Sequence, residues 1–301
     1  MLDISVIILT YNEELHIRRC LENICPIAKK VIVVDSPSTD STVAICHEFD
    51  NVEVVAHKYP GNQAEQFNWA IDNLGIETEW VLRLDADEYL TPELINELKE
   101  KLPTLPNDVN GIIFNRRHIF MGKWVKRGVY PVKLLRMFRY GKGVCEQRLM
   151  DEHIQLTEGR FVEFNYDFCD HNLNNLSWWT QKHIGYAIRE ATDLLDMEYD
   201  LTGSAKNDET INLSSQALKK RRRKHGYAKK PLFWRSFAYF IYRYFFKLGF
   251  LEGKEGFLWH FLQGWWYRTL VDAKVYEIKR KSEGNPDRIK AILRDEYNIV
   301  I

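Results

Sequence analysis

Short apolar runs alternate with polar clusters along the first 90 residues of the chain. Four runs are almost wholly apolar, and a stretch with the helical spacing of apolar positions follows each of the first three. Such runs are typical of strands that are buried on both faces of a parallel sheet. The pattern predicts strands at residues 4–10, 31–35, 52–57 and 80–87, with helices near residues 13–24, 37–49 and 63–74.

Strands and helices that repeat at this spacing predict right-handed βαβ crossovers and a nucleotide-binding α/β sheet. In such sheets the ligand binds beyond the carboxyl ends of the strands. A polar cluster stands at each of these four ends, so we expect the clusters to converge on one site. The four clusters are Thr10–Glu14, Asp35–Asp40, His57–Gln66 and Asp85–Glu88.

Two aspartates stand at the end of the fourth predicted strand: Asp85 and Asp87, with the small Ala86 between them. Alternation along a strand places both carboxylates on one side. Two hard oxygen ligands at such a position suit Mg²⁺ or Mn²⁺. A divalent ion there would neutralise the charge that builds on a departing nucleoside diphosphate. The alternative interpretation is an acidic turn ahead of a helix that begins near Pro92.

Two other acidic positions have two interpretations each. Asp35 could accept a hydrogen bond from a base imide or a ribose hydroxyl, or it could cap the next helix together with Asp40. Glu13 follows Asn12, which we expect to be a helix N-cap, and an acid in the first turn is favourable for the helix dipole whatever its function.

Composition places the chain among folded globular proteins. Hydrophobic residues make up 45% and charged residues 28% of its 301 residues, enough for one large domain or a domain with an appendage. The 42 basic and 42 acidic residues balance, so we expect no nucleic-acid partner. The five cysteines show no CxxC spacing, which favours reduced thiols in a cytoplasmic protein. We expect no secretory signal, because the first predicted strand begins at residue 4.

Four motifs occur in the order VIILTYNEE, VIVVDSPSTDST, GNQAEQFNWAI and WVLRLDADEYL. With them the chain resembles the inverting family-2 glycosyltransferases of the A-type fold. More narrowly, it is similar to bacterial members that build lipopolysaccharide core, O-antigen or capsule. The clear motifs span residues 4–90, and weaker similarity continues to about residue 155. The resemblance implies transfer of a sugar from a nucleotide-sugar donor to a glycan or lipid-linked acceptor, with Mg²⁺ or Mn²⁺ as cofactor.

The resemblance also implies roles for single residues of the donor site. Family members often have an Arg-Asn pair where this chain has Phe67 and Asn68. The donor contact of that arginine would then fall to Lys58 or Gln66. The other donor-binding residues would be Thr10, Tyr11, Glu13, Asp35 and Asp85, and Asp87 would hold the metal.

An inverting transfer needs a base that takes the proton of the acceptor hydroxyl. In the resembling family an acidic residue after the metal motif supplies it, and the matching stretch here is residues 145–156. Glu152 fits this role best, and Asp151 and Glu146 are the alternatives. His153 or His171 would complete the metal shell.

The last third of the chain has a basic run followed by aromatic residues. Residues 216–230 are rich in Lys and Arg, and a projection of the next helix places Arg235, Arg243 and Lys247 on one side and aromatic residues on the rest. Three charges disfavour a membrane span, so this pattern predicts a helix in the membrane interface, with its basic edge toward the headgroups. A buried helical hairpin and nucleic-acid binding are the alternatives.

We therefore expect an A-type catalytic domain at residues 1–204 and a helical, membrane-associating appendage at residues 205–301. The expected location is the cytoplasm, at the inner face of the cytoplasmic membrane. A sugar nucleotidyltransferase would require a Gly-rich loop with Lys or Arg after the first strand. This chain has TYNEELHIRR at that position. A non-catalytic membrane-bound sugar-binding module would need neither the aspartate pair nor the base.

Overall fold

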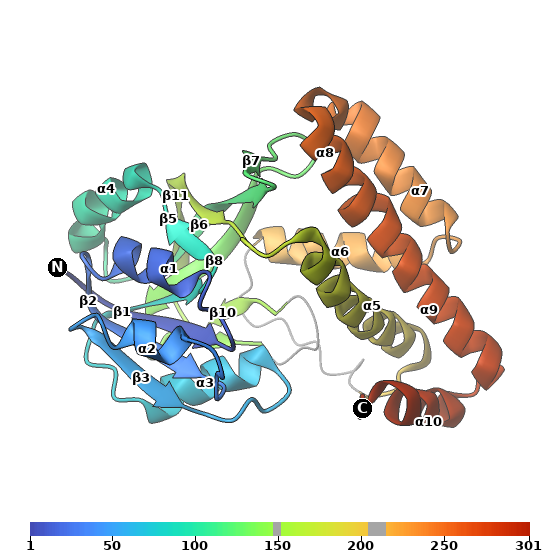
Figure 1. Cartoon of the computed structure of the whole chain (residues 1–301), viewed down its shortest axis with the longest axis horizontal. Helices are drawn as coiled ribbons and strands as arrows, with labels where there is room; N and C mark the ends of the chain where they lie inside the picture. Colours follow the sequence, from blue (N-terminus) through green and yellow to red (C-terminus); the bar gives the residue numbers. More distant parts are fainter. Residues whose placement is uncertain (147–151, 204–214) are drawn as a thin grey trace. The chain divides into compact units, whose positions relative to one another are not determined.

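The structure is a computed structural model that describes residues 1–146, 152–203 and 215–301. The chain divides into two compact units (Figure 1). The first contains Met1–Lys126 and Tyr130–Leu173, and the second contains Arg127–Val129, residues 174–203 and Leu218–Ile301. This division differs from the boundary that we expected at residue 204, because α5 (Leu176–Tyr199) packs on α9 (Tyr267–Ser282) of the second unit.

The first unit is built on a mixed sheet (Figure 1). Its described strands follow the order β3-β2-β1-β4-β8-β6-β11-β5, and β7 pairs with β6. The four predicted strands are confirmed as four neighbouring parallel strands, β3-β2-β1-β4. The bounds are β1 Leu2–Thr10, β2 Ala28–Asp35, β3 Val52–Ala56, β4 Trp80–Asp85, β5 Glu88–Leu90, β6 Val109–Phe120, β7 Lys123–Trp124, β8 Val132–Arg139 and β11 Arg160–Asp170.

Helices cover both faces of this sheet. Successive residues of β1 point to opposite faces, so Ile8 joins one apolar core and Ile7 the other. The core around Ile8 includes residues of α1, α2 and α4, and the core around Ile7 includes residues of α3 and of a small hairpin, β9–β10. The bounds are α1 Ile17–Ile24, α2 Thr42–Cys46, α3 Gln63–Asn73, α4 Pro92–Lys101, β9 Gly143–Cys145 and β10 Ile154–Leu156. The α/β class is as predicted.

The loops that follow β1 and β2 are longer than the sequence pattern predicts. Asn12 is not the N-cap of α1, which begins only at Ile17. Its backbone is left-handed, with φ of 56°, and its side-chain Oδ1 accepts a hydrogen bond of 2.8 Å from the N–H of Thr39. This contact joins the two loops, and α2 is correspondingly short. The carboxyl ends of β1 and β2 are therefore followed by longer irregular loops than we expected.

The second unit is helical. Its core contains Leu195 of α5, Val271 and Ile278 of α9, and Leu293 of α10, all of them buried. Two of its turns are π-helical, at Tyr242–Phe246 and His260–Trp266. The remaining described helices are α6 Ser215–Ala228, which belongs to this unit from Leu218 on, α7 Trp234–Ile241, α8 Gly253–Trp259 and α10 Pro286–Tyr297.

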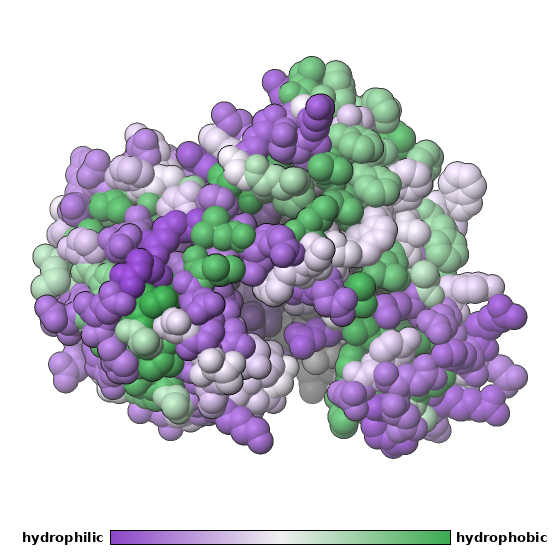
Figure 2. All heavy atoms as spheres, viewed as in Figure 1, coloured by the Kyte–Doolittle hydropathy of each residue, from purple (hydrophilic) through white to green (hydrophobic). Residues whose placement is uncertain are grey.

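The predicted basic edge of α7 is wrong. Arg235 and Arg243 are 4% and 3% exposed, whereas Trp234 and Phe246 are 72% and 75% exposed. For Arg235 the reason is Asp272 of α9, whose buried carboxylate binds the Arg235 guanidinium at 2.6 Å. Figure 2 shows apolar side chains on the surface of the part that carries α7 and α8. In this region the aromatic side chains named above are exposed and the two arginines are buried.

Within the described residues, we find no helix with the length and apolar character that crossing a membrane requires.

Candidate active site

The carboxyl ends of β1, β2 and β4 lie side by side, as expected. Leu9 pairs with Asp85 in the β1–β4 ladder, and Thr10 pairs with Asp35 in the β1–β2 ladder. The hydroxyl of Thr10 donates to Oδ1 of Asp35 at 2.8 Å. The backbone N–H of His57, just after β3, donates to the carbonyl of Asp35. The polar clusters of the four predicted strands therefore belong to one edge of the sheet.

Asp35 organises the loop that follows its own strand. Its side chain is buried, and its two oxygens accept from the Thr10 hydroxyl, the Ser38 hydroxyl at 2.6 Å and the Ser38 N–H at 2.8 Å. Three donors leave a carboxylate with little remaining capacity, since it has about four acceptor positions. Asp35 thus holds the β1 and β2 ends together and presents at most one lone pair to a ligand.

Other predicted donor-site residues differ in how accessible they are. Tyr11 is 62% exposed, and Lys58 is exposed as well. Gln66 is buried, and its amide donates to the Ser36 hydroxyl at 2.9 Å. Of the two candidates for replacing the family's arginine contact, Lys58 is therefore the one at the surface.

The carboxylate of Glu13 contacts a buried histidine. Its Oε2 lies 2.6 Å from Nδ1 of His16, and Nε2 of His16 accepts from the N–H of Leu173 at 2.9 Å. The second contact leaves Nδ1 as the ring nitrogen that donates to Glu13. Glu13 therefore fixes the segment that follows β11 against the segment that follows β1.

Asp85 and Glu88 share a buried arginine of β8. Nη2 of Arg136 lies 2.6 Å from Oε1 of Glu88 and 3.4 Å from Oδ2 of Asp85. The other oxygen of Glu88 accepts from the backbone N–H of Asp85 at 2.9 Å. A second buried arginine, Arg83, has Nε 3.9 Å from Oδ1 of Asp85. Two buried guanidinium groups therefore contact the carboxylates at the ends of the loop between β4 and β5.

These contacts shift the pKa values of the two carboxyl groups in opposite directions. Burial raises the pKa of Asp85, but the charges of Arg136 and Arg83 outweigh it and hold that pKa below its ordinary value. For Glu88 burial is the larger effect, and with the nearby charge of Asp85 it holds the pKa well above its ordinary value, against Arg136. The two guanidinium groups therefore favour the ionised form of Asp85.

Asp87 lies beside the end of β11. Its Oδ2 accepts from the amide of Asn172 at 2.9 Å, and its carbonyl accepts from the N–H of His171 and from Nη2 of Arg19. Burial and the Arg19 charge lower the pKa of His171, so its ring is neutral at pH 7. A neutral imidazole is the form that binds metals. His171, one of the two predicted histidines, is therefore next to the predicted metal ligand.

The residues of the aspartate loop fit a divalent ion whose other ligands come from the substrate and from water. In the described part of the chain, no three His, Cys, Asp or Glu side chains form a group that could hold a metal ion by themselves. Asp87 and Asp85 offer hard oxygens at a strand end. His171 contacts Asp87 through its backbone N–H, and its ring Nδ1 lies 3.1 Å from Nη1 of Arg19. Mg²⁺ is usually bound by one or two carboxylates together with phosphate oxygens of the substrate and water. The residues present are of this kind.

The predicted base lies on the segment that enters β10. Glu152 is described and partly buried, and Asp151 falls outside the described residues. Glu146 is partly buried and accepts from the N–H and Nδ1 of His153, each at 3.0 Å, and from the amide of Gln155. Three donors favour the ionised form and occupy its oxygens. Glu146 is thus less suited to accept a proton than Glu152, and His153 is engaged within the hairpin.

Sequence reasoning did not find several residues of this site. Arg83 and Arg136 lie in apolar strands, where a charged residue among buried neighbours is the only signal. Asn172 follows a strand for which no end was predicted. The packing partners of these side chains are 48 to 85 residues away in the sequence, so their roles depend on the tertiary fold.

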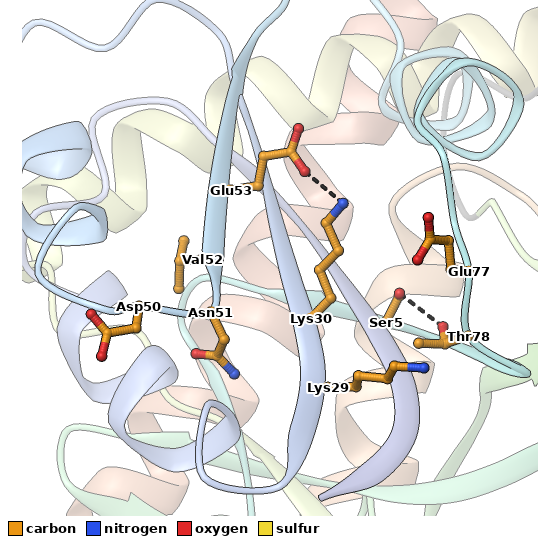
Figure 3. A pocket seen from close by; sticks show the side chains of 9 residues that line it. All are labelled: Ser5, Lys29, Lys30, Asp50, Asn51, Val52, Glu53, Glu77 and Thr78. Carbon is orange, nitrogen blue, oxygen red and sulfur yellow. Dashed lines mark hydrogen bonds and ion pairs between the residues drawn. The ribbon is translucent and has the colours of Figure 1, made fainter.

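A pocket of about 320 Å³ lies at the opposite end of the strands, at the start of β1, β2 and β3 (Figure 3). Its polar groups bind one another: Lys30 pairs with Glu53 at 2.6 Å, and Thr78 donates to the Ser5 hydroxyl at 2.8 Å. Ligands of parallel sheets bind at the carboxyl ends of the strands, so we do not assign the donor to this pocket.

A family model described as Glycosyl transferase family 2 matches residues 5–160, which is more than half of the chain. The chain belongs to glycosyl transferase family 2. The matched region contains the aspartate loop after β4, the Thr10–Asp35 pair and the β9–β10 hairpin.

Bacterial relatives of this family-2 chain align over very different lengths. An uncharacterised glycosyltransferase of Rickettsia typhi is 27% identical over 300 residues, 94% of this chain and 89% of that protein. One of Rickettsia bellii is 36% identical over 96 residues, so this chain spans only 31% of that relative's length. The lipopolysaccharide core biosynthesis glycosyltransferase LpsC of Rhizobium meliloti is 27% identical over 146 residues, 47% of this chain and 53% of LpsC.

Among solved structures, residues 1–349 of TarS from S. aureus align with 94% of this chain and 92% of that chain. The sequence identity is 15% and the TM-score 0.43, and we draw no conclusion from a similarity of this size.

Proposed function

We propose that this protein is an inverting glycosyltransferase of the A-type fold that acts on a nucleotide-sugar donor and a lipid-linked glycan acceptor. The observation that carries the proposal is the position of the Asp85–Ala86–Asp87 loop beside the Thr10–Asp35 pair, at the carboxyl ends of the parallel strands. The membership in family 2 supports it.

Two groups of residues would bind the donor. Asp35 and Thr10, with the exposed Tyr11 above them, would accept the nucleoside. Asp87 and Asp85 would hold a divalent ion against the diphosphate, with His171 or His153 as the further ligand. The bound ion supplies neutralisation of the negative charge on the leaving nucleoside diphosphate. Lys58 is exposed near the end of β3 and would contribute a positive charge on the donor side.

The transfer itself would be a single displacement at the anomeric carbon of the donor. The acceptor oxygen forms a bond to that carbon, and the bond from the carbon to the diphosphate oxygen breaks with its electron pair on the oxygen. Glu152 takes the proton that the acceptor hydroxyl loses. Asp151 is the alternative base. Arg136 and Arg83 keep Asp85 ionised and so keep the donor side ready for a cation.

The surface of the helical unit supports the proposed acceptor class. Exposed aromatic side chains at Trp234, Phe245 and Phe246 alternate with exposed lysines, of which Lys247 and Lys254 are examples. Aromatic side chains with flanking basic residues favour the interface of an anionic bilayer, and each basic residue near such a surface contributes about 1 kcal/mol. We therefore propose peripheral binding to the inner face of the cytoplasmic membrane and a lipid-linked acceptor. The name of LpsC is consistent with an acceptor of the cell-surface glycan class.

The direct test is donor hydrolysis, which needs no acceptor. The intact protein is incubated with UDP-, GDP- and dTDP-sugars in Mn²⁺, in Mg²⁺ and in EDTA, and release of the nucleoside diphosphate is measured. We expect release from one nucleotide class, and only with a divalent ion. Release of pyrophosphate from a sugar 1-phosphate and a nucleoside triphosphate would favour a nucleotidyltransferase instead. Binding of a sugar without any turnover, in every donor and with acceptor glycolipid added, would favour a non-catalytic module.

A further inference from the structure

Three arginines of the helical unit alternate with two tyrosines. Cζ of Arg235 lies 4.8 Å from the ring centre of Tyr227, and Cζ of Arg268 lies 5.3 Å from the same ring. Arg268 is also 4.3 Å from the ring centre of Tyr239, which lies 5.3 Å from Cζ of Arg243. The order is thus Arg235, Tyr227, Arg268, Tyr239 and Arg243, and this arginine–tyrosine stack connects α6, α7 and α9. Cation–π contacts of this kind hold the cations in place without neutralising them.

Negative charge balances one end of the stack and not the other. Arg235 pairs with the buried carboxylate of Asp272. Glu190 acts on Arg268 from a distance, while its Oε2 accepts from the hydroxyl of Tyr267 at 2.7 Å. Arg243 forms no ion pair with any residue that the structure describes. The uncompensated positive charge of the stack is therefore at its Arg243 end.

Arg243 is 3% exposed, yet Nε and Nη2 of its guanidinium have no hydrogen-bond partner among the described residues. These two nitrogens form one edge of the guanidinium, the edge that binds two oxygens of a phosphate or carboxylate at once. A buried charged group with an unpaired edge is costly unless a ligand satisfies it. Burial and the charge of Arg268 both lower the pKa of Arg243, and burial raises the pKa of Tyr239 less than the two guanidinium groups lower it. The surroundings thus favour added negative charge.

The backbone around Arg243 is irregular on both sides. Arg243 belongs to the π-helical turn Tyr242–Phe246. A Cβ built on Gly264, in the other π-helical turn His260–Trp266, would be in ordinary van der Waals contact with Nη1 of Arg243, at 3.6 Å. Single π-helical turns interrupt regular helices and are frequent at functional sites. The aromatic side chains that follow Arg243, Phe245 and Phe246, are more than half exposed.

We propose that the Nε–Nη2 edge of Arg243, supported by Arg268 and the hydroxyl of Tyr239, is a binding site for one phosphate group. The phosphate enters between the two π-helical turns and completes the charge balance of the stack. Two sources offer this chemistry, a phospholipid headgroup and a soluble phosphate. The site lies in the helical unit, so its test does not depend on sugar transfer.

The test is hydrogen exchange of the intact protein in EDTA, followed in peptides that cover residues 239–268. The probes are inorganic phosphate, sodium chloride of equal ionic strength, and vesicles of phosphatidylglycerol or phosphatidylcholine. We compare the wild type with Arg243→Met, which removes the fork but keeps an apolar stem. Lys247→Met is the matched control, because it removes an exposed cation of the same segment. Arg243→Lys keeps the positive charge but has no two-nitrogen edge for a bidentate contact. It replaces Arg243→Met in the comparison if the methionine variant does not fold.

Slower exchange of residues 239–268 in phosphate, but not in chloride, would identify a soluble phosphate as a ligand. Slower exchange only with phosphatidylglycerol would identify the headgroup. In either case the effect should disappear in Arg243→Met, fall several-fold in Arg243→Lys and persist in Lys247→Met. Without phosphate, Arg243→Met should melt at the same temperature as the wild type or a few degrees higher, and phosphate at ten times its Kd should raise the Tm of the wild type alone, by about 3 °C. Equal responses of the wild type and Arg243→Met to every probe would overturn the proposal.

Discussion

Asn68 binds the backbone of Cys145 through both ends of its side-chain amide. Its Nδ2 donates to the Cys145 carbonyl at 2.7 Å, and its Oδ1 accepts from the Cys145 N–H at 2.8 Å. Asn68 lies on α3, and Cys145 is the last residue of β9, from which the chain leads to Glu152. One side chain therefore ties the helix next to the donor site to the segment that carries the proposed base.

This pairing predicts that Asn68→Asp will impair transfer more than donor binding. An aspartate still accepts from the Cys145 N–H, but it has no donor for the carbonyl and repels it, so we expect a loss of about 1–3 kcal/mol in the free energy of unfolding. Urea denaturation and kcat for transfer are the measurements. Asn73→Asp, at the exposed end of the same helix, is the control and should leave kcat within a factor of about two. An unchanged kcat in Asn68→Asp would mean that the hairpin is positioned by other contacts.

Asp87 should be needed for turnover far more than for folding. Asp87→Ala removes the proposed metal ligand, and we expect kcat to fall by about 100-fold or more, because the charge on the leaving group is no longer neutralised. The Tm should stay near that of the wild type. Asp50→Ala, an exposed acid at the other end of the strands, is the control. Full activity of the wild type in EDTA would contradict the metal mechanism.

Glu152→Gln should separate donor binding from transfer. Glutamine keeps the shape of the side chain but accepts no proton, so the nucleotide sugar should bind with an unchanged Kd while kcat falls by about 100-fold or more. Glu158→Gln, on an exposed turn nearby, should transfer normally. If Asp151→Asn is the variant that loses activity, the base is one residue earlier. Normal transfer by both variants would show that this segment is structural.

The parallel half of the sheet was predictable because its strands are continuous apolar runs whose ends are polar. Thr10, Asp35 and Asp85 could be assigned to one edge on that pattern alone, since the carboxyl ends of parallel strands meet at the same edge of the sheet. The other half, in which β8 is antiparallel to β4 and β6 while β11 is parallel to β6, was not predictable. Its strands β8 and β11 carry charged residues that become buried only when partners from distant segments meet them. Arg136 is buried by Glu88, 48 residues away, and no local pattern contains that pairing.

The orientation of α7 was mispredicted for the same reason. A helical projection assumes that charged residues face water, and this holds unless a buried partner is present. Asp272, 37 residues after Arg235, supplies that partner. A single acidic residue in another helix therefore accounts for the burial of Arg235. Arg243 is buried just beyond the end of α7, without an ion pair among the described residues.

Asp272 is accordingly expected to stabilise the helical unit strongly. Asp272→Asn leaves the Arg235 guanidinium buried and uncompensated, and breaking a buried pair in this way costs about 3–5 kcal/mol. We expect a drop of that size in chemical denaturation followed by far-UV circular dichroism. Asp295→Asn removes the same charge from an exposed pair with Arg294 and should change the stability little. Equal stability of the two variants would mean that water reaches Arg235.

The last prediction concerns the bilayer. The protein should sediment with phosphatidylglycerol vesicles and should be released only in part at high salt, because screening weakens attraction of the basic residues but leaves aromatic insertion intact. Replacing the exposed Phe245 and Phe246 with serine should remove the salt-resistant part. They are better probes than Trp265, whose ring stacks on Phe240 at 5.4 Å.

The salt-sensitive part should depend on exposed basic residues of α6 and the turn after it. Changing Arg222, Arg223, Lys229 and Lys230 to glutamine should weaken binding by about 1 kcal/mol per residue and leave donor hydrolysis unchanged. Tyr140→Ser, an exposed aromatic residue of the first unit, is the control for nonspecific loss of aromatic surface. If the wild type does not sediment with vesicles of any composition, the exposed aromatic residues contact something other than lipid. The acceptor would then be soluble, and a water-soluble glycan should support transfer at the same rate as a lipid-linked one.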